Sequence, residues 1–460
     1  MNTKVLFSLL KRPSVKVGVI SFFILFFSFH GNIFGVGSSQ EWYGTFEKVS
    51  SLLVEKRARC QGQDIYKGPI TAKNRDNYMA EMETSRCSLE DYKPYASQYG
   101  LQVRIITFFA PDNKSSLDSY FHKVEMVLSA LAALLLSILV VYVYRIFGSS
   151  VAAFSLAGLA LSVWVVAFAG NMYWVEWILL LPFVFSFTCY RWFKRRGWLW
   201  VFYSTLFSLF VLKLLNGYEY TTTLVVSAFV PIVLHELLLH KRVSIKSLFI
   251  KATTVAGVGA LALLLSVIIN AAALMSEYGS FKNSLQMVMS RVEDRGVGGV
   301  LGMQQYVVDG FRATSPEVAL YVERFYRLDN IEDGRANPLK YAFLSLFNYM
   351  MLPAISLPFI LREPIGSIVQ SIGMTIILAI VALIALRRTR VKPTVLRALT
   401  WSFLVGLGGS FSWLILMPAH MYPHAHINGI LFYLPTLIIA YIIFGVYFDI
   451  LIKKWLGRRK

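Results

Sequence analysis

The chain has 460 residues, of which 56% are hydrophobic and only 15% are charged. Soluble domains carry about 25% charged residues, whereas apolar runs of about twenty residues are typical of membrane-spanning helices. This composition excludes a soluble enzyme, a disordered chain and a disulfide scaffold. The runs also exclude a spanning β-barrel, whose strands alternate. We predict an all-α fold, a polytopic bundle of membrane helices.

The net charge of +19 does not indicate a nucleic-acid partner, because of where the basic residues lie. They gather in short segments between apolar runs, as the positive-inside rule expects of cytoplasmic loops. Four such segments contain no acidic residue: 191–196, 241–251, 387–397 and 453–460. We therefore place all four segments, and both termini, in the cytoplasm.

Eleven apolar runs are candidates for membrane spans. In chain order they are residues 15–36, 124–144, 151–169, 173–190, 198–215, 221–239, 253–274, 341–361, 366–386, 398–417 and 427–452. The first run is long enough to span and has no small-residue cleavage site after it, so we interpret it as an anchor and not as a signal peptide.

The run 341–361 conflicts with this topology if it crosses the membrane, because residues 387–397 would then face outward. It contains Asn348, Pro353 and Pro358, which interrupt a helix. We therefore expect a broken or re-entrant segment lining a cavity, where irregular backbone is tolerated. This leaves ten spans. The alternative is eleven spans and one violation of the positive-inside rule.

The chain then divides into five parts. They are an N-terminus and first span (1–36), an outer loop domain (37–123), spans two to seven (124–275), an outer loop with amphipathic and re-entrant helices (276–365), and the C-terminal spans (366–460). Cys60 and Cys87 share the first outer part, where a disulfide is possible, and Cys189 lies near the cytoplasmic face, where we expect a free thiol.

Ionisable residues at the ends of the spans are candidates for a functional site, because their burial in a membrane is costly. Glu41 follows the first span within Gln40-Glu41-Trp42-Tyr43. A carboxylate among aromatic residues suits either a general base or an ordinary interfacial loop. His235, Glu236 and His240 end another span, and we expect them at the cytoplasmic interface.

Two further glutamates are predicted on the outer side. Glu176 lies one turn inside its span, after Asn171 and Tyr173, and a glutamate at that depth needs a partner. Glu219 follows Tyr218, and an ion pair with Lys213 is a structural explanation for it.

Three histidines, His420, His424 and His426, also map to the outer side. Their spacing is not that of a zinc-binding helix, so we favour recognition of phosphate or sugar over a metal. Arg104 and Arg362 are candidates to bind an anionic headgroup. One face, the outer one, therefore carries Glu41, Glu176, Glu219, Arg362 and the three histidines. The chain contains no phosphate-binding loop of the G-x-x-x-x-G-K-[ST] type. This pattern favours chemistry at the outer surface on a membrane-borne substrate.

The arrangement resembles the GT-C superfamily of integral-membrane glycosyltransferases. Gln40-Glu41-Trp42-Tyr43 stands where these enzymes carry an acidic motif after the first span, although Gln40 occupies the place of the first acid, so a divalent cation is not favoured. The segments 93–102 and 216–220 also resemble parts of such proteins, and 420–428 resembles the turn that faces the lipid-phosphate donor.

The resemblance implies transfer of a sugar from a polyprenyl-phosphate carrier to a glycan, lipid or protein acceptor, with inversion, at the outer face of a bacterial inner membrane. Glu41 would act as general base, and Arg362, Arg104 or His424 would stabilise the departing lipid phosphate. A lipid-linked oligosaccharide polymerase or ligase is the nearest alternative. A transporter or flippase, or a non-catalytic assembly protein, is the alternative from another class.

Overall fold

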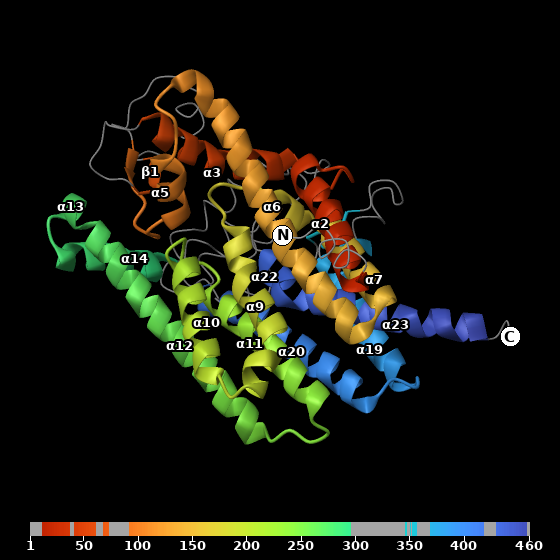
Figure 1. Cartoon of the computed structure of the whole chain (residues 1–460). Helices are drawn as coiled ribbons and strands as arrows, with labels where there is room; N and C mark the ends of the chain where they lie inside the picture. The colour runs from red at the N-terminus through yellow and green to blue at the C-terminus, as the bar shows by residue number, and fades with distance from the viewer. Residues whose placement is uncertain are drawn as a thin grey trace, which may run out of the picture.

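The structure is a computed structural model that describes residues 12–36, 41–60, 68–72, 92–295, 346, 350, 352–356, 369–417 and 429–457. Of residues 41–49, 114 and 292–295 it describes the backbone alone. These ranges fold almost entirely into helices, with one short pair of strands (Figure 1).

Six helical segments in the described ranges are long and apolar enough to cross a membrane. They are α2 (Pro13–Gly31), α6 (Leu117–Phe147), α11 (Thr221–Leu239), α12 (Ile245–Ala273), α20 (Pro393–Leu416) and the run Ile430–Gly457. The chain is therefore a helical membrane protein, as its composition predicts. Three shorter apolar helices, α7 (Ser149–Ala160), α10 (Leu199–Leu214) and α19 (Ile372–Arg387), accompany α9 (Glu176–Arg195). The count of ten spans stays a prediction.

The bundle is built around α11 and the C-terminal run. Helix α11 packs against α9, α12 and α20, while α2 packs along α6. The C-terminal run consists of α22 (Ile430–Phe432), the π-helical turn η4 (Tyr433–Leu437) and α23 (Ile438–Gly457), and α23 packs against α7 and α19. A helix that is apolar on all sides is buried on all sides when it lies inside a bundle. In the C-terminal run, 89% of an 18-residue apolar stretch is buried.

The part predicted as an outer loop is folded. It contains α3 (Glu41–Arg59), an antiparallel pair of β1 (Ile70–Ala72) with β2 (Tyr92–Pro94), and α5 (Leu101–Phe108), which lie together at one end of the bundle (Figure 1). Val54 of α3, Ile106 of α5 and Phe121 of α6 share one hydrophobic cluster. Helix α6 begins at Leu117, before the predicted start of its span at Val124, because its first turns pack against this domain.

Two of the predicted apolar runs do not form one continuous helix. The run 151–169 is divided into α7, which ends at Ala160, and α8 (Val163–Phe168). The reason lies about 190 residues away, where the extended segment 352–356 inserts against the break. The Leu161 carbonyl accepts a hydrogen bond from Ser356 N (2.9 Å), and Ser162 forms an antiparallel bridge with Ile355. The C-terminal run is likewise interrupted, at Leu434, whose backbone is not helical.

The described residues of the run 341–361 agree with a broken segment. Residues 352–356 are not helical, and Pro353 forms a bridge with Ser371 at the start of α19. The Trp164 indole donates a hydrogen bond to the Pro353 carbonyl (2.7 Å). Whether this segment crosses the membrane stays a prediction. The short α13 (Met275–Tyr278) and α14 (Phe281–Arg295) follow α12, and residues 296–345 of the outer loop predicted to contain amphipathic helices lie outside the described residues.

Candidate functional site

Buried charged side chains gather at the two ends of the bundle. We call the end that carries α3 and α5 the loop-domain end, and the end that carries residues 191–196, 241–251 and 387–397 the basic end. Helices α9 and α11 each carry a buried glutamate near one terminus, Glu176 at the start of α9 and Glu236 in the last turn of α11. The two carboxyl groups therefore belong to different sites.

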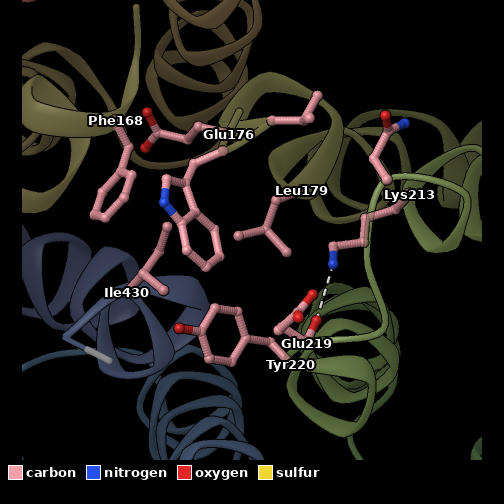
Figure 2. A pocket seen from close by; sticks show the side chains of 10 residues that line it. Phe168, Glu176, Leu179, Lys213, Glu219, Tyr220 and Ile430 are labelled. Atoms are coloured by element: carbon pink, nitrogen blue, oxygen red, sulfur yellow. Dashed lines mark hydrogen bonds between the residues drawn. The ribbon is translucent and has the colours of Figure 1, made fainter. Parts of the chain in front are cut away.

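At the loop-domain end a pocket opens between several helices, and Figure 2 shows its side chains. We call it the Glu176 pocket. Its lining residues are Phe168, Trp174, Val175, Glu176, Leu179, Lys213, Asn216, Glu219, Tyr220 and Ile430. Its volume is about 30 Å³, enough for about two water molecules and too small for a sugar ring.

Glu176 is the unusual member of this pocket. Its side chain is 3% exposed, and neither carboxylate oxygen has a hydrogen-bond partner within the described part of the chain. In Figure 2 its carboxyl group lies beside Phe168, across the pocket from Lys213. The partner that its depth predicts is therefore not found in the described residues. Burial of a carboxylate is costly unless a hydrogen-bond donor or a cation satisfies it, so this position favours a ligand donor.

Lys213 holds the opposite wall of the pocket. Its ammonium donates hydrogen bonds to the backbone carbonyls of Gly217 (2.7 Å) and Glu219 (2.9 Å). The hydrogen bond to Glu219 goes to its backbone oxygen, and the ion pair with its carboxylate stays a prediction. The ammonium therefore fixes the turn between α10 and α11, in which Tyr220 has a left-handed backbone (φ 64°).

Gly217 brings the Glu219 carboxylate close to the turn. Its φ is 129°, and a Cβ atom at this position would collide with the Glu219 carboxylate and approach the Gln98 side-chain oxygen to 2.9 Å. A glycine is therefore required here for both backbone and space. The consequence is that Glu219 lies against its own turn, next to a residue of the loop domain.

The loop domain docks on this turn through Gln102, which ends the segment 93–102 and was not among the predicted site residues. Gln102 N donates to Asn216 Oδ1 (2.7 Å), its side-chain amide donates to the Met172 carbonyl (2.8 Å), and its Oε1 accepts from the Trp177 indole (3.1 Å). Gly100 N also donates to the Leu215 carbonyl (2.7 Å). These hydrogen bonds connect the loop domain directly to Asn216, which lines the Glu176 pocket, and to its neighbours.

Of the other described candidates, Asn171 and Tyr218 hold segments next to the pocket, whereas Arg104 lies away from it. Asn171 Oδ1 accepts the backbone N–H groups of Tyr173 and Trp174 (both 2.8 Å), which fixes the segment before Glu176. The Tyr218 hydroxyl donates to the Ser266 carbonyl of α12 (3.2 Å). Arg104 does not line the pocket. Its guanidinium lies 4.2 Å from the Tyr99 ring centroid, and its Nε donates to the Tyr99 carbonyl (3.0 Å).

The remaining candidates cannot be placed against this pocket. Gln40, Arg362, His420, His424 and His426 lie outside the described residues. Glu41, Trp42 and Tyr43 form the first turn of α3, with only their backbone described. Cys60 is disulfide-bonded, Cys189 carries a free thiol, and Cys87 lies outside the described residues. Across the described ranges no group of three or more His, Cys, Asp or Glu side chains is arranged to hold a metal ion.

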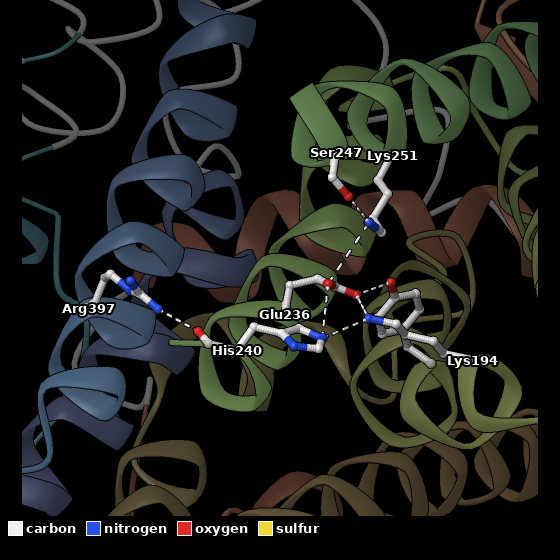
Figure 3. A network of polar contacts seen from close by, with 7 residues as sticks. Lys194, Glu236, His240, Ser247, Lys251 and Arg397 are labelled. Carbon is white, nitrogen blue, oxygen red and sulfur yellow. Dashed lines mark hydrogen bonds and ion pairs between the residues drawn. The ribbon is translucent and has the colours of Figure 1, made fainter. Parts of the chain in front are cut away.

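At the basic end, Glu236 forms the centre of a polar cluster (Figure 3). We call it the Glu236 cluster. Tyr190 and Lys194 of α9 each donate a hydrogen bond to Glu236 Oε1 (both 2.6 Å). His240 Nε2 and Lys251 Nζ each lie 3.9 Å from Oε2. The cluster therefore ties α9, α11 and α12 together around one carboxylate.

His235 and Glu236 lie at the basic end and are buried there, and the position of this end at the cytoplasmic interface stays a prediction. Their exposed fractions are 2% and 3%, because α9 covers this end of α11. The His235 ring bonds to the Phe187 carbonyl (2.7 Å). Arg397 completes the end of α11 by donating to the carbonyls of His240 and Lys241 (both 2.6 Å). These contacts hold the helix ends together, so we interpret the cluster as structural.

A scan against protein-family models and searches of curated proteins and solved structures find no match to this chain. Function is therefore argued from the residues and their geometry.

Proposed function

We propose that this protein is a membrane glycosyltransferase of the GT-C type, which moves a sugar from a polyprenyl-phosphate carrier to a glycan, lipid or protein acceptor. The observation that supports this most is the Glu176 pocket, where a carboxyl group without a hydrogen-bond partner among the described residues lies next to a docked loop domain. Such polar residues at one end of a membrane bundle suit chemistry on a substrate whose tail stays in the bilayer.

In this proposal the loop-domain end faces the exterior of a bacterial inner membrane. Ten spans place both termini, and the basic end, in the cytoplasm. The distribution of Lys and Arg among the loops supports this orientation.

The reaction needs a base, an attacking hydroxyl and a leaving group. Glu41 takes the proton of the acceptor hydroxyl, the hydroxyl oxygen attacks the anomeric carbon, and the bond from that carbon to the lipid phosphate breaks with inversion. The pocket is too small to hold the sugar, so we place it beneath the sugar, where Glu176 accepts a hydrogen bond from a sugar hydroxyl. Arg104, Arg362 and His424, with His420 and His426, are the candidates that stabilise the departing phosphate.

The alternative of a transporter is less well supported by the described residues. A proton-coupled or substrate pathway uses ionisable side chains along the membrane interior. On α11, no ionisable residue occurs between Glu219, just before the helix, and His235, in its penultimate turn. The buried charges of α9 and α11 thus gather at the helix ends. A polymerase or ligase would use the same face and the same donor.

The test is sugar transfer by the purified full-length protein in detergent, with a panel of polyprenyl-phosphate sugars and a lipid and glycan extract as acceptor. Glu41→Gln is compared with wild type and with Asp112→Asn, which removes an exposed acid from the same part of the chain. We expect Glu41→Gln to lower the rate by about 100-fold or more, and Asp112→Asn to leave it unchanged. Each protein is also assayed with EDTA, in which we expect transfer to continue.

Transfer that is equally fast in Glu41→Gln and wild type would contradict Glu41 as the base, and Glu176→Gln is then the next variant. In lipid vesicles that contain the purified protein, movement of the lipid between leaflets without transfer would contradict the enzyme and support a flippase.

A further inference from the structure

A second pocket lies at the basic end, outside the site proposed for sugar transfer. It is a groove between α10 and α12, which pack against each other. We call it the α10–α12 groove. Its lining residues are Leu199, Tyr203, Ser244, Lys246, Ser247, Ile250, Lys251 and Thr254. Its volume is about 420 Å³, within the range of about 300 to 1,000 Å³ that small-molecule sites occupy.

The polar side of the groove is rich in groups that bind an anion. Lys246 is exposed, and the structure shows no hydrogen bond or ion pair for it among the described residues. Lys251 lies one turn further along α12 and donates to Ser247 Oγ (2.6 Å). Two ammonium groups and several hydroxyls on one wall suit a phosphate oxygen cluster, which accepts several hydrogen bonds at once.

The surroundings strengthen the positive potential of this wall. The neighbouring segments 191–196 and 387–397 contain no acid, and neither does 241–251, which includes both lysines. The buried carboxylate nearest to Lys251 is Glu236, at 3.9 Å, and it already accepts hydrogen bonds from Tyr190 and Lys194. One carboxylate shared between Lys194 and Lys251 leaves the groove with excess positive charge.

Exposed apolar side chains that are sequence neighbours of the groove residues favour a lipid as the source of the phosphate. Ile245 is 85% exposed, Phe249 66% and Trp200 72%. In a helical membrane protein such side chains face lipid or the interface. A lipid would place its phosphate at the lysines and its acyl chains over these exposed apolar side chains.

We propose that the α10–α12 groove binds the phosphate group of an anionic membrane lipid, with Lys246 and Lys251 as its cationic ligands. Basic pockets between membrane helices suit such headgroups. This inference does not rest on the proposed transfer reaction, because the groove and the Glu176 pocket have no lining residue in common.

The experiment measures lipid retention by the purified full-length protein with native mass spectrometry in mild detergent. Phosphatidylglycerol is titrated in one arm, phosphatidylcholine in a second, and inorganic phosphate in a third. Lys246→Gln is compared with Lys246→Arg, which keeps the charge, and with Lys241→Gln, which removes an exposed lysine of the same segment outside the groove. Unfolding temperatures are recorded for every variant.

We expect wild type to prefer phosphatidylglycerol and Lys246→Gln to bind it about fivefold more weakly, the effect of one cation near an anionic headgroup. Lys246→Arg and Lys241→Gln should bind as wild type does. Binding of inorganic phosphate with the same dependence on Lys246 would support the anion site and overturn lipid as its source. Equal binding of the two lipids, or equal loss in Lys246→Gln and Lys241→Gln, would overturn the proposal.

Discussion

Glu176 and Glu236 are both 3% exposed, yet their surroundings differ completely. Glu236 receives two hydrogen bonds of 2.6 Å, and Lys251 Nζ and His240 Nε2 lie within 4 Å of its other oxygen. Glu176 has no hydrogen-bond partner within the described part of the chain. The two residues share a side chain and a degree of burial, so the difference between them lies in their partners.

This comparison separates a structural carboxylate from a functional candidate. A buried polar group that is fully hydrogen-bonded holds its neighbours together. One that is left without a partner in the folded chain destabilises it, and sites of this kind cluster where a ligand binds. The Glu236 cluster joins helices, whereas the Glu176 pocket offers an acceptor to a substrate. Matched substitutions at the two sites are expected to separate these roles.

The largest effect on stability is expected for Glu236→Leu. It removes the acceptor that Lys194 and the buried Tyr190 hydroxyl share, and because Lys194 is 28% exposed we expect a cost of about 3 kcal/mol, from the loss of two hydrogen bonds to a charged group. Thermal unfolding of the purified protein in detergent measures this as a large drop in Tm. The control is Asp449→Asn, which breaks the pair with Lys453, whose side chain is 74% exposed. Its cost is under about 1 kcal/mol. Equal changes in the two variants would contradict the structural role of the cluster.

A smaller effect is expected for Lys213→Met. The substitution keeps the length of the side chain but leaves the Gly217 and Glu219 carbonyls without their donor, at a cost of about 2 kcal/mol. The amides of residues 216–220 should then exchange with deuterium faster, while those of the Glu236 cluster stay protected. Unchanged exchange in this turn would show that Lys213 does not hold the wall of the pocket.

The sequence predicts the class of the fold and part of the site. Apolar runs are a local signal, so the run 221–239 coincides with α11 (Thr221–Leu239). The break at Leu161 has no local signal, because the segment that causes it is distant in the chain. Glu176 and Glu219 were selected by their positions at helix ends, and both line the pocket.

Other parts of the site depend on packing that the sequence does not display. Gln102 acts only because α5 docks on the turn after α10, and no periodicity marks it. The position of Glu236 near a helix end is visible in the sequence, but its enclosure by Tyr190 and Lys194 from α9 is not. Glu41 follows the first span at the start of α3, and its relation to the pocket stays a prediction.

The most direct test of the separation is Glu176→Leu, the same substitution as at Glu236, assayed for unfolding and for sugar transfer. Because Glu176 has no described partner to lose, we expect a Tm equal to or above that of wild type. We expect transfer to fall by about 10- to 100-fold, the contribution of a hydrogen bond to a charged group. A drop in Tm as large as that of Glu236→Leu, or transfer at the wild-type rate, would contradict the account.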